Sequence, residues 1–429
     1  MGRPVRLLSV IAASLALWVA VLSLSATSAL AVGFDNRPST VNDLGLQVKS
    51  AVLMEAESGQ VVYEVNPDEP LPIASMTKLM TEYIVLREIK NERMKWEDVV
   101  TVHPVAADTD RSESQIYLAA GDQHTVKDLY IAMAVGSAND ATKALAIQVA
   151  GSIEAFVEKM NATADELGLK TAVFTSVTGF ENTTVMSAGD MARLARHILV
   201  EHPEFLEYSS IQDYKFRERD TAPMINFNYM LGSNVNKISL KHLAYEGVDG
   251  MKTGFINAAG YNFTGTVKKG DMRYISVVMD TSTKDARFYE TAKLYNYAYA
   301  TFEKKTVLPP KSVVDTVKTV KIKKGVKKSV PVVTDKDITF MVKKGVEPKI
   351  SMKGMELLTE KELVAPIAAG TKVGTVTYTY ADESTGKNLD YTVNLVTTVE
   401  AEKAGWFKLF FRGIGDFFSN LFNSILDLF

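Results

Sequence analysis

Apolar residues recur at helical spacing in the first two thirds of the chain. From Met76 onward they follow at intervals of three and four residues, which predicts an amphipathic helix that begins near Ser75, after Pro72. The same spacing predicts further helices over 125–135, 141–149, 153–167, 187–199 and 285–302. The segment 99–121 is polar and broken. We expect loops around a cleft there, with four exposed charged residues: Asp108, Asp110, Arg111 and Glu113.

Runs of strand-forming residues bounded by turn signals mark three β regions. Residues 50–54 and 60–65 predict a hairpin that delivers the chain to the helix at Ser75. Residues 249–255, 261–267 and 273–279 predict antiparallel strands, the last two joined by a turn at 269–271. Beyond Pro309-Pro310, Val, Thr and Lys dominate up to residue 400, which predicts a small all-β domain. Its lysines are typical of solvated strand faces, and a contact with a wall polymer is the alternative.

The N-terminal residues have the pattern of an export signal. Arg3 and Arg6 precede an apolar run over 7–24, and Ala29-Leu30-Ala31 offers a small-residue cleavage site. We therefore expect residues 1–31 to be a signal peptide that is removed from the mature protein. The alternative is an uncleaved membrane anchor, because the apolar run is near the minimum length that spans a bilayer.

The last residues, 401–429, predict an amphipathic helix of a different kind. Aromatic and aliphatic residues recur at steps of three and four, and basic or polar residues occupy the other face. Such a helix lies in the membrane interface with its aromatic side chains inserted, so we expect 404–429 to bind a membrane surface. The alternative is a core helix or an oligomer-forming helix.

Composition narrows the possible chemistry. The 429 residues are 46% hydrophobic, enough for full cores in two or three domains, and the formal net charge of −3 gives no basic face for nucleic acid. The absence of cysteine excludes disulfides and thiol chemistry. The five histidines form no metal-binding pattern, so we expect neither a metal nor another cofactor.

Three short motifs carry the candidate chemistry. In Ser75-Met76-Thr77-Lys78, one helical turn separates a hydroxyl from an amine, and a buried, neutral amine can take the proton of a serine nucleophile. Ser137-Ala138-Asn139 follows a glycine that permits a sharp turn toward this helix, although both polar residues could simply cap helices. Lys252-Thr253-Gly254 lies on a predicted strand whose small residues leave the backbone within reach of a bound chain.

The chain also supplies a control for the first motif. Ser384 and Lys387 have the same spacing, but they lie between two alternating runs, which indicates a hairpin turn and not a helix. A turn need not hold the lysine over the serine. Taken alone, Ser75 could likewise be a capping serine followed by a solvated lysine, and the two other motifs in order argue against that interpretation.

Together the motifs and the order of parts resemble the low-molecular-mass penicillin-binding proteins that act as serine-type D-alanyl-D-alanine carboxypeptidases. The resemblance implies an α/β (mixed) catalytic domain of the serine β-lactamase/transpeptidase type over 32–308, with an antiparallel sheet flanked by helices. An all-β domain over 309–400 and an anchor helix follow. It further implies removal of the terminal D-alanine from peptidoglycan pentapeptide stems, covalent inhibition by β-lactams, and a place on the outer face of the bacterial cytoplasmic membrane.

The resemblance also implies roles for the motif residues. Ser75 corresponds to the acylated nucleophile, Lys78 to its general base and Ser137 to a proton relay toward the leaving D-alanine. Asn139 would hold the substrate amide. Lys252 would keep the site electropositive and help to keep Lys78 neutral.

A second group of residues would bind the substrate. The backbone N–H groups of Ser75 and Phe255 correspond to the oxyanion hole, with Gly254 beside them, and Thr253 and Arg287 correspond to the positions that bind the terminal carboxylate. The alternative for Arg287 is an arginine at a helix start with no ligand. Ile256 departs from the family, which often has threonine there, so a hydrogen bond at that position is lost.

Two other functions remain open at this point. A serine β-lactamase uses the same three motifs, but many carry an E-x-x-L-N element for deacylation, and no Leu-Asn dipeptide occurs in this chain. A non-catalytic wall-binding relative would retain the fold, but it would not need all of the motif residues. Turnover of a D-Ala-D-Ala peptide separates these possibilities.

Overall fold

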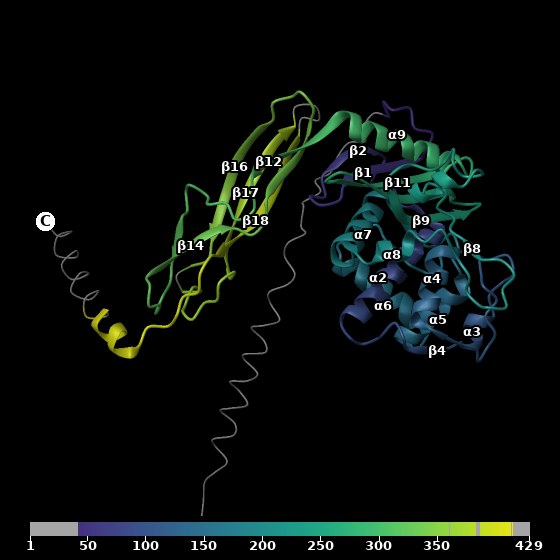
Figure 1. Cartoon of the computed structure of the whole chain (residues 1–429), viewed down its shortest axis with the longest axis horizontal. Helices are drawn as coiled ribbons and strands as arrows, with labels where there is room; N and C mark the ends of the chain where they lie inside the picture. The colour runs from purple at the N-terminus through teal and green to yellow at the C-terminus, as the bar shows by residue number, and fades with distance from the viewer. Residues whose placement is uncertain (1–41, 360, 383–386, 413, 415–429) are drawn as a thin grey trace, which may run out of the picture. The chain divides into compact units, whose positions relative to one another are not determined.

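The structure is a computed structural model that describes residues 42–359, 361–382, 387–412 and 414 (Figure 1). Their contacts form two compact units that divide between Glu303 and Lys304, a few residues before Pro309. We describe each unit by itself. The predicted signal peptide lies outside the described residues.

The first unit is built on a five-stranded antiparallel sheet with the order β2-β1-β11-β10-β9. Its strands come from both ends of the unit: β1 (Ser50–Glu55), β2 (Val61–Val65), β9 (Val248–Ile256), β10 (Gly260–Lys269) and β11 (Met272–Thr281). The hairpin of β1 and β2 and the run of three later strands are confirmed. Strand β1 pairs along its length with β11, with Ser50 opposite Met279. The sheet therefore combines strands that come before and after the helical residues in the sequence.

Helices cover both faces of this sheet. Helix α9 (Ala286–Thr301) packs on β10 and β11, and α7 (Ala188–Glu201) packs on β1 and β11 from the side that Figure 1 shows below the sheet. Helix α8 (Phe205–Ser209) packs on β9, and the remaining helices are α2 (Lys78–Lys90), α3 (Pro104–Ala107), α4 (Val126–Gly136), α5 (Asn139–Ala150) and α6 (Ile153–Glu166). All the predicted helices of this region are present, with ends that differ by at most a few residues.

Helix α2 differs from the prediction in one respect that matters for the site. It is not amphipathic, because its side chains from Lys78 to Leu86 are all buried. Helices α4, α5, α6 and α7 each pack against it, so no face is left for solvent. A lysine and a glutamate on this helix therefore lie in the interior.

Short elements complete the first unit. Strand β3 (Leu71–Pro72) pairs with β6 (Val185–Met186), β4 (Val99–Thr101) with β5 (Gln123–Thr125), and β7 (Asp213–Tyr214) with β8 (Met224–Ile225). Two short 3₁₀ helices are η1 (Ala74–Thr77) and η2 (Gly232–Asn236). The pair of β3 and β6 fixes the chain directly before η1, which leads into α2.

The second unit is all-β, as predicted. A five-stranded sheet has the order β13-β14-β18-β17-β16, and a separate pair joins β12 to β15. The strands are β12 (Phe302–Leu308), β13 (Thr319–Lys321), β14 (Ser329–Thr334), β15 (Ile338–Lys343), β16 (Lys349–Leu357), β17 (Lys372–Asp382) and β18 (Lys387–Thr397). Its core is largely valine on alternating positions, for example Val330 and Val332 on β14, which are fully buried.

The control motif falls between two strands of this sheet. Strands β17 and β18 pair antiparallel up to Asp382 opposite Lys387. Ser384 lies between them, outside the described residues, so the predicted hairpin turn is itself not described. The strands on either side are those that the alternating pattern predicted.

Only the start of the predicted C-terminal helix is described. Residues 406–412 are helical, and four aromatic side chains there are exposed: Trp406, Phe407, Phe410 and Phe411. Arg412 donates hydrogen bonds to the carbonyl oxygens of Gly325 and Val326 in the same unit, so this basic residue is not free in solvent. Among the described helices, none combines the length and apolar character that crossing a bilayer requires.

Candidate active site

The Ser75 hydroxyl lies at the start of helix α2, directly against a buried lysine amine. Ser75 belongs to η1, and the Nζ atom of Lys78, one turn further, lies 3.1 Å from its Oγ atom. The same amine donates to the carbonyl oxygen of Thr178 at 3.0 Å. Lys78 is 0% exposed, while Ser75 is half-buried. The serine can thus be reached from the site, and the lysine behind it cannot be reached by bulk water.

Two glycines allow other segments to approach the serine closely. A Cβ atom on Gly179 would lie 2.0 Å from the carbonyl oxygen of Ala74, and a Cβ atom on Gly254 would lie 2.6 Å from that of Ile73. Gly179 also has a φ of +72°, in the region that favours glycine. The loop over 175–182 and strand β9 therefore enclose the Ser75 turn from two directions, and any side chain at either glycine would push them apart.

The amines of the site have lowered pKa values. Burial is the main cause that lowers the pKa of Lys78 well below its usual value, and the nearby charge of Lys252 lowers it further. Glu113 and Glu82 act in the opposite direction. Burial also lowers the pKa of Lys252, to about 8. A neutral Lys78 is thus accessible near neutral pH, as a general base requires.

Ser137 joins the second motif to the third. It ends α4 with a left-handed φ of 55°, which turns its side chain away from the helix axis, and it is buried. The Nζ atom of Lys252, on β9, donates to Ser137 Oγ at 2.9 Å and to the carbonyl oxygen of Thr253 at 3.3 Å. Two motifs separated by more than a hundred residues are thereby in direct contact.

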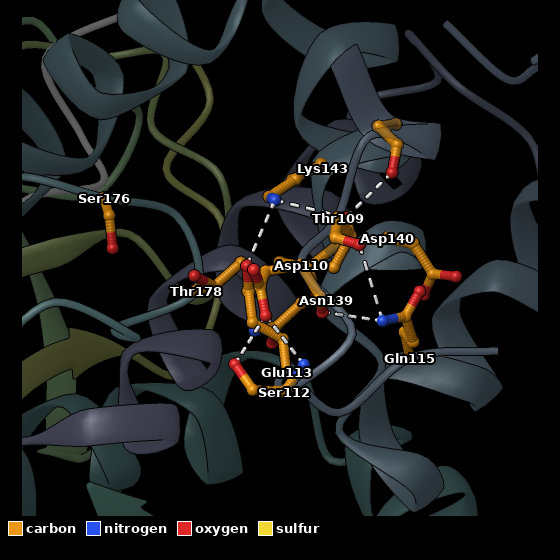
Figure 2. Close-up of polar contacts among 12 residues, drawn as sticks. Thr109, Asp110, Ser112, Glu113, Gln115, Asn139, Asp140, Lys143, Ser176 and Thr178 are labelled. Carbon is orange, nitrogen blue, oxygen red and sulfur yellow. Dashed lines mark hydrogen bonds and ion pairs between the residues drawn. The ribbon is translucent and has the colours of Figure 1, made fainter. Parts of the chain in front are cut away.

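Asn139 begins α5 and is oriented by a carboxylate. Its Nδ2 atom donates to Glu113, which also forms an ion pair with Lys143 over 3.6 Å, and Lys143 donates to Thr109 Oγ1 at 3.1 Å (Figure 2). A carboxylate can only accept, so the amide nitrogen of Asn139 must face Glu113. The Oδ1 atom of Asn139 then faces the other way, buried and without a hydrogen-bond partner among the described residues. This acceptor is available to a substrate N–H group.

The position of Glu113 corrects the sequence-based prediction. We expected it to be exposed on a polar loop, but its side chain is only 8% exposed. The loop is folded onto α5, because the backbone N–H of Asn139 donates to Ser114 and the Asp140 carboxylate accepts from the N–H groups of Ile116 and Leu118. Figure 2 shows Glu113 and Lys143 among the side chains of this loop and of α5. Asp108, Asp110 and Arg111 are exposed, as expected.

The remaining predicted residues lie along β9 and the start of α9. Thr253 and Gly254 are buried, whereas Phe255 is 45% exposed and stacks on Tyr261 with the ring centroids 4.2 Å apart. Arg287 is buried, with its guanidinium over the rings of Tyr261 and Phe288.

The Arg287 guanidinium keeps one donor free. Its Nε atom has no hydrogen-bond partner among the described residues. Burial lowers its pKa to about 10, so it keeps its charge. It is therefore equipped to bind an anion.

Three residues contact or face the motif residues without having been predicted as part of the site. Glu113 and Thr178 can be recognised only from their contacts in the structure. Nothing in the sequence of a loop shows which glutamate side chain or which backbone carbonyl will contact the motif residues. Glu82 had a signal, because a carboxylate four residues after Lys78 interrupts an otherwise apolar run. Within the described ranges, no group of three or more residues could hold a metal ion.

Known proteins match the chain over nearly its full length. Residues 37–283 match the Peptidase S11 family, D-alanyl-D-alanine carboxypeptidase, and 302–403 match the C-terminal domain of penicillin-binding protein 5. The chain is 34% identical to D-alanyl-D-alanine carboxypeptidase DacF of Bacillus subtilis over 376 residues, which is 87% of this chain and 91% of that protein. It is also 34% identical to D-alanyl-D-alanine carboxypeptidase DacC of Escherichia coli over 373 residues, which is 86% of this chain and 88% of that protein.

Solved structures agree with this relationship. The crystal structure of penicillin-binding protein 5 from Haemophilus influenzae is 31% identical and gives a TM-score of 0.67, with 86% of this chain and 100% of that chain covered. This similarity confirms the predicted fold class. The chain belongs to the S11 peptidase family, the D-alanyl-D-alanine carboxypeptidases.

Proposed function

We propose that this serine-type D-alanyl-D-alanine carboxypeptidase acts through an acyl-enzyme on Ser75, with Lys78 as the general base. The observation that carries the proposal is the contact of a half-buried serine hydroxyl with a fully buried amine, 3.1 Å apart. Burial and the charge of Lys252 favour the neutral amine. A neutral amine in that place has a lone pair for the proton that Ser75 loses.

Acylation then proceeds in two steps that use the observed contacts. Ser75 Oγ attacks the carbonyl carbon of the penultimate D-alanine while its proton passes to Lys78 Nζ. The backbone N–H groups of Ser75 and Phe255 stabilise the resulting oxyanion, and such donors typically contribute about 3 kcal/mol each. As the C–N bond breaks, Ser137 donates its proton to the amine of the leaving D-alanine and takes the proton that Lys78 had accepted, so Lys78 is neutral again, with Lys252 held 2.9 Å from the Ser137 hydroxyl.

Deacylation uses the same groups in the reverse sense. With the D-alanine gone, a water molecule takes its place, and Lys78 accepts the proton of this water as it attacks the ester carbon. The tetrahedral intermediate collapses, the ester bond to Ser75 Oγ breaks as Lys78 returns the proton to that oxygen, and the shortened stem peptide leaves. A β-lactam ring acylates Ser75 in the same way, but its leaving amine stays attached, which blocks the second step and explains covalent inhibition by penicillins.

Substrate orientation is assigned to three buried groups. Asn139 accepts a hydrogen bond from a backbone N–H of the stem peptide through the Oδ1 atom that has no partner among the described residues. Arg287 and Thr253 bind the terminal carboxylate, for which a guanidinium offers two parallel hydrogen bonds. Gly254 lets β9 lie close against the Ser75 turn, since a Cβ atom there would be 2.6 Å from the carbonyl oxygen of Ile73, and so keeps the backbone of β9 near the nucleophile.

The place of the enzyme is part of the proposal. Residues 1–31 direct export, 32–308 form the peptidase domain, 309–400 form the all-β domain, and 401–429 attach the protein to the outer face of the cytoplasmic membrane. The exposed aromatic side chains over 406–411 support the last assignment, because an interfacial helix inserts such residues. Arg412 is one of the basic residues on the other face of this helix, and its hydrogen bonds to the carbonyl oxygens of Gly325 and Val326 leave it less free to bind headgroups.

Mass spectrometry tests the central assignment. The mature protein is incubated with a labelled penicillin, digested, and searched for the modified peptide. We expect label on the peptide that contains Ser75, none on a Ser75→Ala protein, and release of D-alanine from a pentapeptide by the wild type alone. Label that persists in Ser75→Ala, or label on the peptide that contains Ser384, would overturn the assignment.

A further inference from the structure

The Arg287 guanidinium is held by aromatic rings and not by a carboxylate. Its Cζ atom lies 4.8 Å from the centroid of the Phe288 ring and 5.7 Å from that of the Tyr261 ring. Within the described ranges no carboxylate forms an ion pair with it, and its Nε atom has no hydrogen-bond partner there. Arg273, by contrast, donates to both carboxylate oxygens of Asp249 at 2.7 Å. The two arginines therefore differ in the number of donors that remain for a ligand.

This way of holding an arginine suits a residue that must bind an anion. A guanidinium is planar, so a ring against its face attracts it while the N–H groups at its edge stay unused. An aspartate partner would occupy two of these N–H groups. Phe288 is the next residue on α9 and is only 1% exposed, whereas Tyr261 belongs to β10 and is half-buried. Of the two rings, Tyr261 is the one that links the arginine to the sheet.

The Tyr261 ring also contacts the strand that carries the third motif. Tyr261 lies opposite Phe255 in the pairing of β10 with β9, and residues opposite each other in an antiparallel pair share a face of the sheet. The two rings stack with their centroids 4.2 Å apart and their planes 22° apart. Thr253 is two positions from Phe255, so it shares that face. Tyr261 therefore joins the proposed oxyanion-hole residue on β9 to the proposed carboxylate-binding arginine on α9.

We propose that Tyr261 is a positioning residue that fixes the Arg287 guanidinium for the terminal carboxylate of the peptide, and so sets the preference of the enzyme for substrates that end in a free acid. The inference rests on the proposed role of Arg287. It assigns the effect to the face of the ring, because the hydroxyl of Tyr261 forms no hydrogen bond in the part of the chain that the structure describes. Without the ring, the guanidinium samples more orientations, and a bound carboxylate must first order it.

Tyr261→Leu tests this role by removing the ring while keeping an apolar side chain. The substrates are a pentapeptide that ends in D-Ala-D-Ala and the same peptide with a C-terminal amide, and release of the last residue is measured for each. We expect KM for the acid to rise about tenfold with kcat within about twofold of the wild type. The values of kcat/KM for the amide should stay within about twofold, so the preference for the acid falls about tenfold.

Tyr261→Phe keeps the ring and removes only the hydroxyl, so it should match the wild type within about twofold with both peptides. Tyr245→Leu is the matched control elsewhere in the unit. Tyr245 is also half-buried, with the Nζ atom of Lys269 4.4 Å from its ring centroid and the Tyr295 ring 5.4 Å away. It contacts no residue of the proposed site in these interactions, so we expect an unchanged preference for the acid.

Labelling at saturating fluorescent penicillin gives the folded fraction of each variant, and the kinetic values are divided by it. If Tyr261→Leu does not fold, Tyr261→Ile has a β-branched side chain that suits a strand and must show the same rise in KM for the acid.

Three results would overturn the inference. Tyr261→Leu could keep the wild-type KM for the acid, or it could lose the same factor with the acid and the amide, as a purely structural residue would cause. Tyr261→Phe could lose as much as Tyr261→Leu, and the hydroxyl would then be the functional group.

Arg287→Gln separates these results from failure of the proposed function. If this variant keeps the preference for the acid, the proposed role of Arg287 is wrong. If it loses the preference while Tyr261→Leu keeps it, the role of Arg287 stands and only the inference about Tyr261 fails.

Discussion

Replacing Lys78 by arginine should nearly abolish acylation, although the positive charge is kept. The Nζ atom of Lys78 has two neighbours in the structure, Ser75 Oγ at 3.1 Å and the carbonyl oxygen of Thr178 at 3.0 Å. Neither the Ser75 hydroxyl itself nor the Thr178 carbonyl can act as the base that removes the serine proton. Arginine stays protonated throughout the accessible pH range, so it can donate to both neighbours but cannot accept a proton.

The size of the loss follows from the coupling of nucleophile and base. In serine hydrolases, removing either the nucleophile or its base lowers kcat about as much as removing both, by roughly 10⁶-fold. The residual rate comes from the oxyanion hole and substrate binding. For Lys78→Arg we expect kcat/KM to fall by about 10⁴-fold to 10⁶-fold. This corresponds to about 5.5–8 kcal/mol of transition-state stabilisation. The larger, permanently charged side chain should also lower the free energy of unfolding, by about 3 kcal/mol.

The assay measures D-alanine release from a pentapeptide and the rate of labelling by a fluorescent penicillin. Lys143→Arg is the control, because Lys143 is a third lysine beside the site that pairs with Glu113 and has no proposed catalytic role. It should keep activity within about threefold of the wild type, since arginine can form the same ion pair. Turnover by Lys78→Arg within about tenfold of the wild type would refute the reasoning, and the base would then be another group.

Three further predictions follow from individual contacts. Glu113→Gln should raise KM for the peptide about tenfold with little change in kcat, because a neutral amide holds Asn139 less firmly; a fall in kcat alone would contradict this. Gly179→Ala should lower the free energy of unfolding by about 2–4 kcal/mol in urea titrations, since its Cβ atom would meet the carbonyl oxygen of Ala74, and near-wild-type stability would be inconsistent with the packing. Truncation after Glu400 should release the mature enzyme from membranes with hydrolysis in solution unchanged, and a truncated protein that still sediments with membranes would exclude the anchor.

Local sequence patterns were sufficient for most elements of the fold. Runs of strand-forming residues bounded by turn signals predicted the strands that became β9, β10 and β11. The pattern was less informative for α2. Its apolar spacing predicted one buried face, but the helices around it bury every side chain from Lys78 to Leu86. How many neighbours surround a helix is a property of the tertiary structure.

The motif residues were also predictable, because each motif is a short run whose chemistry depends on residue type and local spacing. Ser75 and Lys78 are one helical turn apart, and that distance follows from helix geometry alone. The contact between Lys252 and Ser137 does not, since β9 reaches α4 only through the pairing of strands from both ends of the unit. The sequence supplied the parts of the site, and the long-range pairing assembled them.

What the sequence by itself determined is thus the set of elements, the order of the motifs and the residue types at the site. The tertiary structure alone decided which charged side chains are shielded from water. Glu113 stands in a polar loop and Glu82 in a helix, yet Glu82 is buried, the side chain of Glu113 is only 8% exposed, and both act on Lys78. The protonation of a buried group depends on burial and on charges brought from other segments, and these are not local properties of a sequence.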